Sequence, residues 1–364
     1  MRHALALGRR GLGTVWPNPA VGCVIEAGGR VVGRGWTQPG GRPHAETEAL
    51  AMAGRAARGA AAYVTLEPCA HHGATPPCAE ALVAAGVSRC VVATRDPDPR
   101  VQGRGIAMLR AAGIEVTEGV LEKEARAANA GFLSRVLRGR PALTLKLASS
   151  FDGRIATASG ESRWITGPAA RRLVHAERLR HDAVMVGAGT ARADDPSLMV
   201  RGMGEVRQPV RIVLSRRLDV DPAGALGRTA REVPVWLLHG REAQADRRAA
   251  WEASGAKLIE APVADGQIDP EAALGALGAA GLTRVFCEGG GALAASLLSA
   301  GLVDELAGFT AGVALGAEGH PGLGAMGIGA LAEAPRFDLI EARRVGADVL
   351  HRWRQSQDWP ASSP

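Results

Sequence analysis

The chain has 364 residues, which is long enough for two domains of ordinary size, each with its own core. Hydrophobic residues make up 46% of it and charged residues 22%, a balance that excludes a disordered protein. No run of eighteen apolar residues occurs, and the opening MRHALALGRRGLG lacks the long apolar segment of a secretory signal. We therefore expect a cytoplasmic protein with no membrane partner.

The net charge of +6 fits a nucleic-acid partner, an anionic small substrate or simply an arginine-rich composition. Basic residues do not cluster with aromatic ones, which argues against nucleic acid. Cysteines number five, and Cys23, Cys90 and Cys287 lie in apolar, strand-like stretches. These three have the pattern of reduced core residues.

The first 139 residues alternate strand and helix signals. In chain order we expect an opening helix, two strands around a turn at 27–29, a helix beginning near His44, a strand over 61–68, a helix over 78–86, a strand over 89–99, a helix over 103–113, a strand over 114–120 and a helical stretch over 122–139. Alternation of this kind predicts an α/β layer in which helix starts lie beside strand ends.

A second cycle of strands and helices begins at Pro141, so we expect domains over 1–139 and 140–356 and a loose tail over 357–364. Its expected elements are a long strand over 143–156, a helix over 168–180, strands over 183–190, 209–215 and 232–240, a helix over 271–281, a strand over 284–290, a helix over 292–301 and one last strand near the end of the chain.

His44, Cys69 and Cys78 form a candidate metal site. Prolines flank both cysteines, and Cys78 opens a helix, whose positive end lowers the pKa of a nearby thiol. Three protein ligands leave the fourth position of a tetrahedral zinc open, which is typical of a catalytic site. The alternative is that both cysteines are ordinary core residues.

Glu46, two residues after His44, is the non-ligating carboxylate that moves protons in such a site. His-x-Glu followed by Pro-Cys is the signature of zinc nucleobase deaminases, although here eight residues rather than two separate the cysteines. Two alternatives stay open at this point. One is a nucleic-acid deaminase with an unrelated second half, and the other is a non-catalytic binder with a structural zinc.

Three glycine-containing loops follow strands in the second half. Residues 284–298, RVFCEGGGALAASLL, place three glycines before a helix whose N-terminus can bind phosphate, although a tight turn fits them equally well. Residues 186–196 end in two aspartates, which could simply cap a turn, and residues 149–167 form a long polar loop. Together the three loops predict a dinucleotide site with a small substrate.

Over nearly its whole length the chain resembles the bifunctional deaminase–reductases of riboflavin biosynthesis. The matching stretches are PNPAVGCVI, PHAETEAL, YVTLEPCAHHGATPPC, DPDPRVQGRG, LKLASSFDGRIATASGESRWITG, GTARADDP and CEGGGALAASLL. The spacing in PCAHHGATPPC looks like this family's version of the zinc loop.

The resemblance implies a cytidine-deaminase-like three-layer α/β/α domain followed by a dihydrofolate-reductase-like α/β domain. The first would use zinc (Zn²⁺) to deaminate 2,5-diamino-6-(5-phosphoribosylamino)pyrimidin-4(3H)-one. The second would use NADPH to reduce the ribosyl chain, giving 5-amino-6-(5-phosphoribitylamino)uracil. The expected partner is therefore a small phosphorylated aminopyrimidine, and we also expect a homo-oligomer.

The resemblance also implies roles for individual residues. Those corresponding to NADPH contacts are Ala148, Trp164, Thr190, Asp194, Ser215, Gly290, Gly291, Ala292, Leu293, Ala294, Ala295 and Ser296. Those corresponding to substrate contacts are Asn18 in the deaminase half and Ser162, Arg178, Leu198, Arg201 and Glu288 in the reductase half, with Lys146 a weaker candidate. Without the resemblance, Arg178 would be assigned to a solvated helix face. Ala74 stands where the family usually has Arg or Lys, which removes one candidate phosphate ligand.

Overall fold

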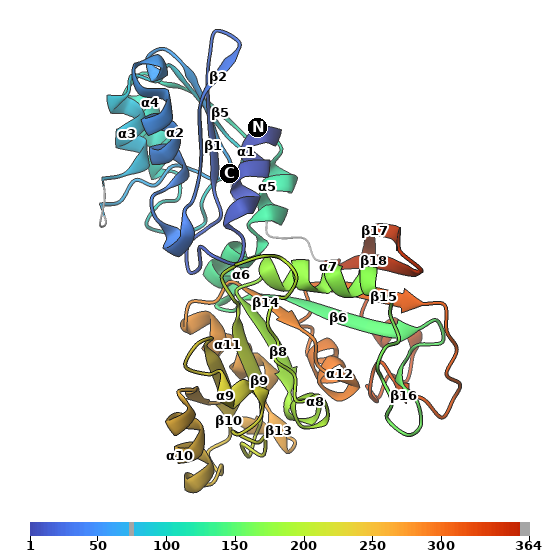
Figure 1. The fold of residues 1–364 in the computed structure, drawn as a ribbon. Coiled ribbons are helices and arrows are strands. Elements are labelled where there is room, and N and C mark those ends of the chain that lie inside the picture. Colours follow the sequence, from blue (N-terminus) through green and yellow to red (C-terminus); the bar gives the residue numbers. More distant parts are fainter. Residues whose placement is uncertain (73–75, 357–364) are drawn as a thin grey trace. The chain divides into compact units, whose positions relative to one another are not determined.

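The computed structural model describes residues 1–72 and 76–356. They form two compact units, the first spanning Met1–Gly139 and the second beginning at Arg140 (Figure 1). Ala74 and the expected tail over 357–364 lie outside the described residues. Within the described part of the chain, no helix is long and apolar enough to cross a membrane.

The first unit is built on a five-stranded sheet in the order β2-β1-β3-β4-β5. Its strands are β1 (Gly22–Ala27), β2 (Arg30–Trp36), β3 (Ala61–Val64), β4 (Arg89–Val92) and β5 (Glu115–Glu118). β1 pairs antiparallel with β2 and β3, whereas β3, β4 and β5 run parallel. β3 and β4 are shorter than the sequence pattern predicts, because the chain leaves the sheet before Pro68 and Pro97, which cannot donate to a ladder.

Helices cover both faces of this sheet (Figure 1). α1 (Arg2–Gly8) and α5 (Glu122–Ala128) contact each other on one face, and α2 (Ala45–Ala53), α3 (Cys78–Ala84) and α4 (Arg104–Ala111) lie together on the other. α6 (Ala130–Arg138) completes the unit. The expected three-layer α/β/α arrangement is confirmed.

Small residues let α2 lie unusually close to the sheet. A Cβ at Gly35 would lie 2.1 Å from the Ala45 carbonyl oxygen, and one at Gly33 would lie 2.2 Å from that of Ala49. Glycine is therefore required at both positions, because the helix backbone occupies the space of a side chain. This packing fixes the start of α2, where His44 and Glu46 lie, against strand β2.

The second unit is built on a nine-stranded sheet in the order β11-β10-β9-β8-β14-β6-β15-β18-β17. Its strands are β6 (Ala142–Ser150), β8 (Ala183–Gly187), β9 (Val210–Leu214), β10 (Val235–His239), β11 (Lys257–Glu260), β14 (Arg284–Cys287), β15 (Glu305–Ala311), β17 (Phe337–Val345) and β18 (Asp348–Gln355). The strands from β11 to β15 are parallel, and β18 and β17 are antiparallel additions.

The helices of this unit are α7 (Pro168–Leu179), α8 (Ala188–Asp194), α9 (Ala225–Arg228), α10 (Ala245–Ser254), α11 (Pro270–Ala279) and α12 (Gly291–Ser299). α7 packs on the sheet through Ala170, which joins Phe309 and Leu350 in one apolar cluster. A second cluster gathers side chains of β8, β9 and β10 around the fully buried Trp251 of α10. The expected α/β fold of the second domain is confirmed.

Three features of the second unit differ from the sequence expectations. The single strand expected over 143–156 is broken: β6 ends at Ser150, and β7 (Arg154–Ala156) pairs with β16 (His320–Pro321). The break is a turn in which the Ser150 hydroxyl accepts the Arg154 N–H at 2.9 Å and Gly153 has φ +78°. The residues expected as a glycine turn after β8 form helix α8, since Ala188 and Ala191 favour a helix. α10, β15 and β17 were not expected at all.

Neighbouring strands β9, β8, β14 and β6 all end at one edge of the sheet, because they are parallel. From β8 the chain runs outward through β9 and β10 to β11, and it then returns to insert β14 between β8 and β6. Parallel sheets bind ligands outside the carboxyl ends of their strands, at such a reversal of order. The three glycine-containing loops therefore leave the sheet at the edge where a ligand is expected.

Candidate functional site

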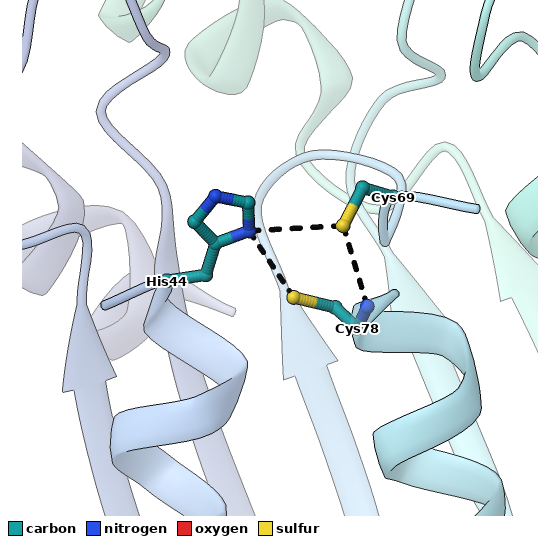
Figure 2. A group of neighbouring side chains, drawn as sticks. All are labelled: His44, Cys69 and Cys78. Carbon is teal, nitrogen blue, oxygen red and sulfur yellow. Dashed lines mark hydrogen bonds between the residues drawn. The ribbon is translucent and has the colours of Figure 1, made fainter. Parts of the chain in front are cut away.

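His44, Cys69 and Cys78 come together in the first unit (Figure 2). His44 is the residue before the first turn of α2, Cys78 is the first residue of α3, and Cys69 lies in the loop between β3 and α3. The ring nitrogen Nδ1 of His44 and the two Sγ atoms all lie within 4.8 Å of one another. The predicted ligand set is thus assembled by two helix starts and one loop.

The spacing of these atoms suits zinc. Bonds of about 2.0 Å to nitrogen and 2.3 Å to sulfur in a tetrahedral site put nitrogen and sulfur about 3.6 Å apart. His44 Nδ1 lies 3.2 Å from Cys78 Sγ and 3.7 Å from Cys69 Sγ. One nitrogen and two sulfurs are also the donors that zinc prefers, and they leave one tetrahedral position for a water or substrate.

The surroundings of Cys69 favour its thiolate form. Hydrogen bonding with Cys78 is the largest cause that lowers the pKa of Cys69, to about 4, and the bond with His44 acts in the same direction. The backbone N–H of Cys78 donates to Cys69 Sγ at 3.3 Å, so the start of α3 supports the negative charge. The hydrogen bond with Cys69 and then burial raise the pKa of Cys78.

Glu46 lies in the first turn of α2 with only 4% of its surface exposed. Burial raises the pKa of its carboxyl to about 7, and the neighbouring Cys69 thiolate adds to the shift. A bound dication would oppose this rise. A carboxyl that exchanges its proton near neutral pH is suited to general acid–base catalysis.

Asn18 packs against the segment that leads to His44. Its carboxamide packs against Gly41, where a Cβ would come within 1.9 Å of Asn18 Nδ2. Gly41 has φ +88° and lies three residues before His44. The Pro-Asn-Pro turn is therefore brought to the segment that enters the metal site.

Glu67 is a buried residue of this region that sequence reasoning missed. Its carboxylate accepts four backbone N–H groups, those of Asp96, Gly103, Gly105 and Ile106, at 3.0–3.3 Å. Gly105 also packs so closely that a Cβ there would lie 1.9 Å from the Pro68 carbonyl oxygen. The start of α4 is thus fastened to the residues just before Cys69. The only sequence signal was the position of Glu67 within the motif LEPC.

His71 is a second missed residue. It lies two residues after Cys69, and its Nδ1 is buried with no hydrogen-bond partner among the residues that the structure describes. A buried polar atom without a partner is costly, so His71 Nδ1 has hydrogen-bonding capacity that the described residues leave unused.

In the second unit, two of the expected cofactor loops meet directly. The backbone N–H of Gly290 donates to the Thr190 hydroxyl at 3.1 Å. A Cβ at Gly290 would meet only that hydroxyl, at 3.4 Å, and one at Gly189 would meet nothing within 4 Å. The backbone here is open to a close approach, as a dinucleotide phosphate at the start of α12 requires.

The backbone at Gly291, in contrast, has no free space beside it. A Cβ there would lie 2.8 Å from the Pro321 carbonyl oxygen, and the Gly324 N–H donates to the Gly291 carbonyl at 2.9 Å. The segment 321–324 therefore occupies the space in front of this glycine. The glycine at 291 is required by the protein's own backbone.

The polar loop that precedes α7 reaches the end of α8. Arg163 donates to the Asp194 carbonyl oxygen at 3.0 Å. Trp164 is 66% exposed, and the Arg171 guanidinium lies 4.5 Å from the centre of its ring. Trp164 and Asp194 are therefore brought to one region, and Ser162 is half-buried in the same loop.

Arg178 and Glu288 form a bidentate ion pair at the carboxyl end of β14. Arg178 donates to the two carboxylate oxygens at 2.6 and 3.1 Å, and its third bond, of 2.7 Å, goes to the Met199 carbonyl. Burial pushes the pKa of Glu288 upward, but Arg178 and Lys146 outweigh it, so the net pKa is lowered. Arg178 is thus not on a solvated face, and its charge is neutralised by Glu288.

Lys146 lies on β6 and interacts electrostatically with Glu288. Burial lowers the pKa of its ammonium, and Arg178 acts in the same direction, whereas Glu288 and Asp194 oppose the shift. A half-buried lysine with a lowered pKa gives up its proton more readily than an exposed one. Lys146, the weaker candidate from the sequence, therefore interacts with three of the expected site residues, namely Glu288, Arg178 and Asp194.

Some residues that were expected to contact the cofactor or the substrate have buried side chains. Ser215 is fully buried, and its hydroxyl is bonded to Asp219 at 2.9 Å. Leu198 packs in the core and is only 3% exposed. Ala294 and Ala295 point into the core from α12, so the first turn of that helix can contact a ligand only through residues before them. Ala292, Leu293 and Ser296 lie on α12 outside the buried set, and Ala148 packs partly against the α7 cluster.

Comparisons with known families match both units. A family model described as "Cytidine and deoxycytidylate deaminase zinc-binding region" matches residues 1–94, and one described as "RibD C-terminal domain" matches residues 141–351. The chain is 44% identical over 364 residues to riboflavin biosynthesis protein RibD of Escherichia coli (strain K12), covering 96% of this chain and 97% of that protein. It is 39% identical over 350 residues to RibD of Bacillus amyloliquefaciens, covering 96% and 94%.

Solved structures agree over the full chain. Acinetobacter baumannii RibD, form 1, superposes with a TM-score of 0.88 at 38% identity, covering 98% of each chain. A Thermotoga maritima protein described as a diaminohydroxyphosphoribosylaminopyrimidine deaminase/5-amino-6-(5-phosphoribosylamino)uracil reductase superposes with a TM-score of 0.85 at 33% identity, covering 98% of this chain and 97% of that one.

Proposed function

The chain belongs to the RibD family of riboflavin biosynthesis proteins, and on this premise we propose which of its residues carry out its two reactions. It is a bifunctional enzyme that deaminates a diaminopyrimidinone carrying a phosphoribosylamino group and then reduces the ribosyl chain. Zinc and NADPH are its cofactors. A nucleic-acid deaminase with an unrelated second half does not fit a RibD C-terminal match over residues 141–351.

We assign deamination to residues 1–139. His44, Cys69 and Cys78 hold zinc, which when bound supplies the Lewis acidity that activates water at neutral pH. Glu46 takes a proton from the attacking water and returns it to the leaving amino group. The burial that raises its pKa to about 7 supports this exchange.

The pyrimidine needs polar contacts beside the metal. The carboxamide of Asn18 offers both a donor and an acceptor for its edge, and its packing on Gly41 holds it near His44. The Nδ1 of His71, which has no partner within 1–72 and 76–356, offers one further contact. Ala74 cannot serve as a phosphate ligand, so we expect a weaker hold on the substrate phosphate than a basic residue would give.

We assign reduction to residues 140–356. NADPH, when bound, would supply the hydride that reduces the sugar carbon carrying the nitrogen. Opening of the sugar ring also requires a proton on the ring oxygen. Lys146 is our candidate for the proton donor, because its pKa is lowered and it lies beside Glu288. The Thr190–Gly290 contact and the start of α12 hold the dinucleotide phosphates.

Arg201 is the cation best suited to the substrate phosphate. Its side chain is exposed, and no ion pair is found for it among the described residues. Arg178 is already paired with Glu288, so we assign it the role of holding that carboxylate and the Met199 carbonyl in place. Glu288 is then held for contact with the substrate's polar groups.

We also propose a homo-oligomer that works in the cytoplasm. β17 is an edge strand, and Leu339, Ile340 and Val349 on β17 and β18 are 43–52% exposed, which supports a second copy of the chain covering them. All five cysteines are free, which suits a reducing compartment that also keeps thiolate ligands available. Light scattering of the purified chain would give its subunit number.

The observation that carries the proposal is a single site in which the buried Glu46 accompanies His44, Cys69 and Cys78. Purified protein should convert the diaminopyrimidinone phosphate to its deaminated form without NADPH. With NADPH it should convert the substrate further, to the ribityl product. Mass analysis of the products separates the two steps. Oxidation of NADPH with no change in the substrate would contradict the proposal.

A further inference from the structure

A short segment of the reductase unit, residues 197–201, is fastened almost entirely by side chains from outside it. We call this segment the strap. It follows α8 and carries two of the expected substrate contacts, Leu198 and Arg201. Four side chains outside the strap form these fastenings, which are hydrogen bonds to its backbone. Arg211 Nη1 donates to the Ser197 carbonyl at 3.3 Å, and Arg178 Nη1 donates to the Met199 carbonyl at 2.7 Å. Gln208 bonds to both backbone groups of Val200, and His175 Nδ1 accepts the Arg201 N–H at 3.2 Å.

The strap has a conformation that its own sequence does not favour. Leu198 has φ +54°, in the left-handed region that non-glycine residues rarely adopt, and its side chain is buried in the core. Such a residue is strained and persists only where its surroundings enforce it. The outside fastenings are therefore needed to keep the strap in this shape.

Gln208 makes the most complete of these fastenings. Its Oε1 accepts the Val200 N–H at 2.7 Å, and its Nε2 donates to the Val200 carbonyl at 3.2 Å. One side chain thus imitates the two-bond pairing of an adjacent strand. The next residue, Arg201, is held through its backbone by His175 on α7. Both fastenings act immediately beside the exposed Arg201 side chain.

We propose that His175 and Gln208 are positioning residues for the reductase substrate, fixing the strap so that Arg201 meets the substrate phosphate. The inference rests on the proposed reductase function and goes beyond it by naming two residues that act through the backbone of the strap. A preformed cation binds a phosphate more tightly, because the free protein has already ordered the segment that presents it.

His175 can accept the Arg201 N–H only while its ring is neutral. Burial lowers the pKa of His175, and the guanidiniums of Arg178 on the same helix and Arg201 on the strap lower it further. Glu288 and the Met199 backbone oppose them. The pKa of His175 is therefore lowered, and its ring takes up a proton less readily than that of an ordinary histidine. Protonation removes the acceptor, so the strap loosens as the pH falls.

Four variants test the inference in the full-length chain. His175→Leu and Gln208→Leu remove the fastenings, and each should raise the KM for the deaminated phosphoribosylaminouracil about tenfold while kcat changes little. His175→Asn places an amide oxygen where Nδ1 lies, so it should keep the wild-type KM at pH 7. Arg172→Ala, an exposed residue on the same helix, should change nothing. Deaminase activity of the same polypeptide and circular dichroism report whether each variant is folded.

The pH profile separates positioning from a general structural role. In the wild type, the dissociation constant of the aminouracil phosphate, measured by calorimetry, should rise as the pH falls below about 6.5. In His175→Asn the part of this rise due to the ring should be absent, and the titration of the substrate phosphate itself is common to both proteins. Unchanged KM values in both leucine variants, or identical pH profiles in wild type and His175→Asn, would overturn the inference. A wild type that binds this substrate but does not reduce it would count against the proposed reaction, while the dissociation constants would still decide the role of the strap.

Discussion

Thr190 accepts the backbone N–H of Gly290 at 3.1 Å, a bond between residues one hundred positions apart in the chain. It joins the start of α8 to the glycines before α12, and these two loops leave the neighbouring strands β8 and β14. The hydroxyl satisfies an N–H that precedes the first turn of α12. The remaining N–H groups of that turn are then held in a fixed direction for a dinucleotide phosphate.

Replacing Thr190 with valine should therefore weaken NADPH binding about tenfold, since the shape stays but the acceptor is lost. Thr190→Ser keeps the hydroxyl and should bind NADPH nearly as well as the wild type. Calorimetric titration with NADPH measures both, and deamination should be unaffected in either variant. Equal affinities for valine and serine would show that the bond between the two loops does not organise the cofactor site.

Cys69→Ser should lose zinc, because a hydroxyl is a poor substitute for the thiolate that the structure holds at this position. The wild type should contain about one zinc per chain by metal analysis. Cys287→Ala is the matched control, since Cys287 is a buried free cysteine of the second unit and should leave the zinc content unchanged. Full zinc occupancy in Cys69→Ser would remove this residue from the ligand set.

Glu46→Gln should reduce deamination by about 100-fold or more, because the amide keeps the shape but cannot take up a proton. Zinc should remain bound, as Glu46 is not one of the three clustered ligands. Reduction of the already deaminated substrate should proceed at the wild-type rate. If both activities fell while the protein stayed folded, the assignment of the two reactions to separate units would be wrong.

Glu67→Gln should weaken the attachment of the start of α4 to the residues just before Cys69. Its carboxylate accepts four N–H groups, whereas an amide offers one acceptor oxygen and turns donors toward the others. Losing buried acceptors of this kind costs about 1–3 kcal/mol. Hydrogen exchange at the amides of Gly103, Gly105 and Ile106 should accelerate, and zinc should bind less tightly. Glu115→Gln, an exposed surface substitution, serves as the control and should leave these amides protected.

The metal site could be predicted from the sequence because its information is local. His44 and Cys78 open helices, and the prolines and glycines around them mark those starts. The site of the second unit was harder to predict from the sequence, because it depends on which strands become neighbours in the sheet. Nothing in the local pattern shows that β14 inserts between β8 and β6, and that order alone brings Lys146 beside Glu288. The burial of Ser215 and Leu198 could not be predicted from the sequence either, because the local pattern places both residues at the edges of loops.

Gly291 tests the difference between a glycine required by the ligand and one required by the fold. The family resemblance implied a ligand role, whereas the residues alone fitted a tight turn equally well. A Cβ at this position would lie 2.8 Å from the Pro321 carbonyl oxygen and 3.2 Å from the Gly324 nitrogen. Backbone atoms cannot move aside as a side chain end can, so Gly291→Ala must displace the segment 321–324. It should therefore lower the unfolding temperature of the second unit, as strained core substitutions do.

Gly290→Ala gives the contrasting result. Gly290 has φ −71°, which any residue adopts, and its Cβ would make only an ordinary contact with the Thr190 hydroxyl at 3.4 Å. This variant should stay as stable as the wild type and yet bind NADPH more weakly, because the methyl group occupies the space of the approaching phosphate. Calorimetry with NADPH, thermal unfolding and the deaminase assay together separate the two glycines. A Gly290→Ala protein with wild-type NADPH affinity would exclude the start of α12 as the phosphate site, whatever the stability of Gly291→Ala.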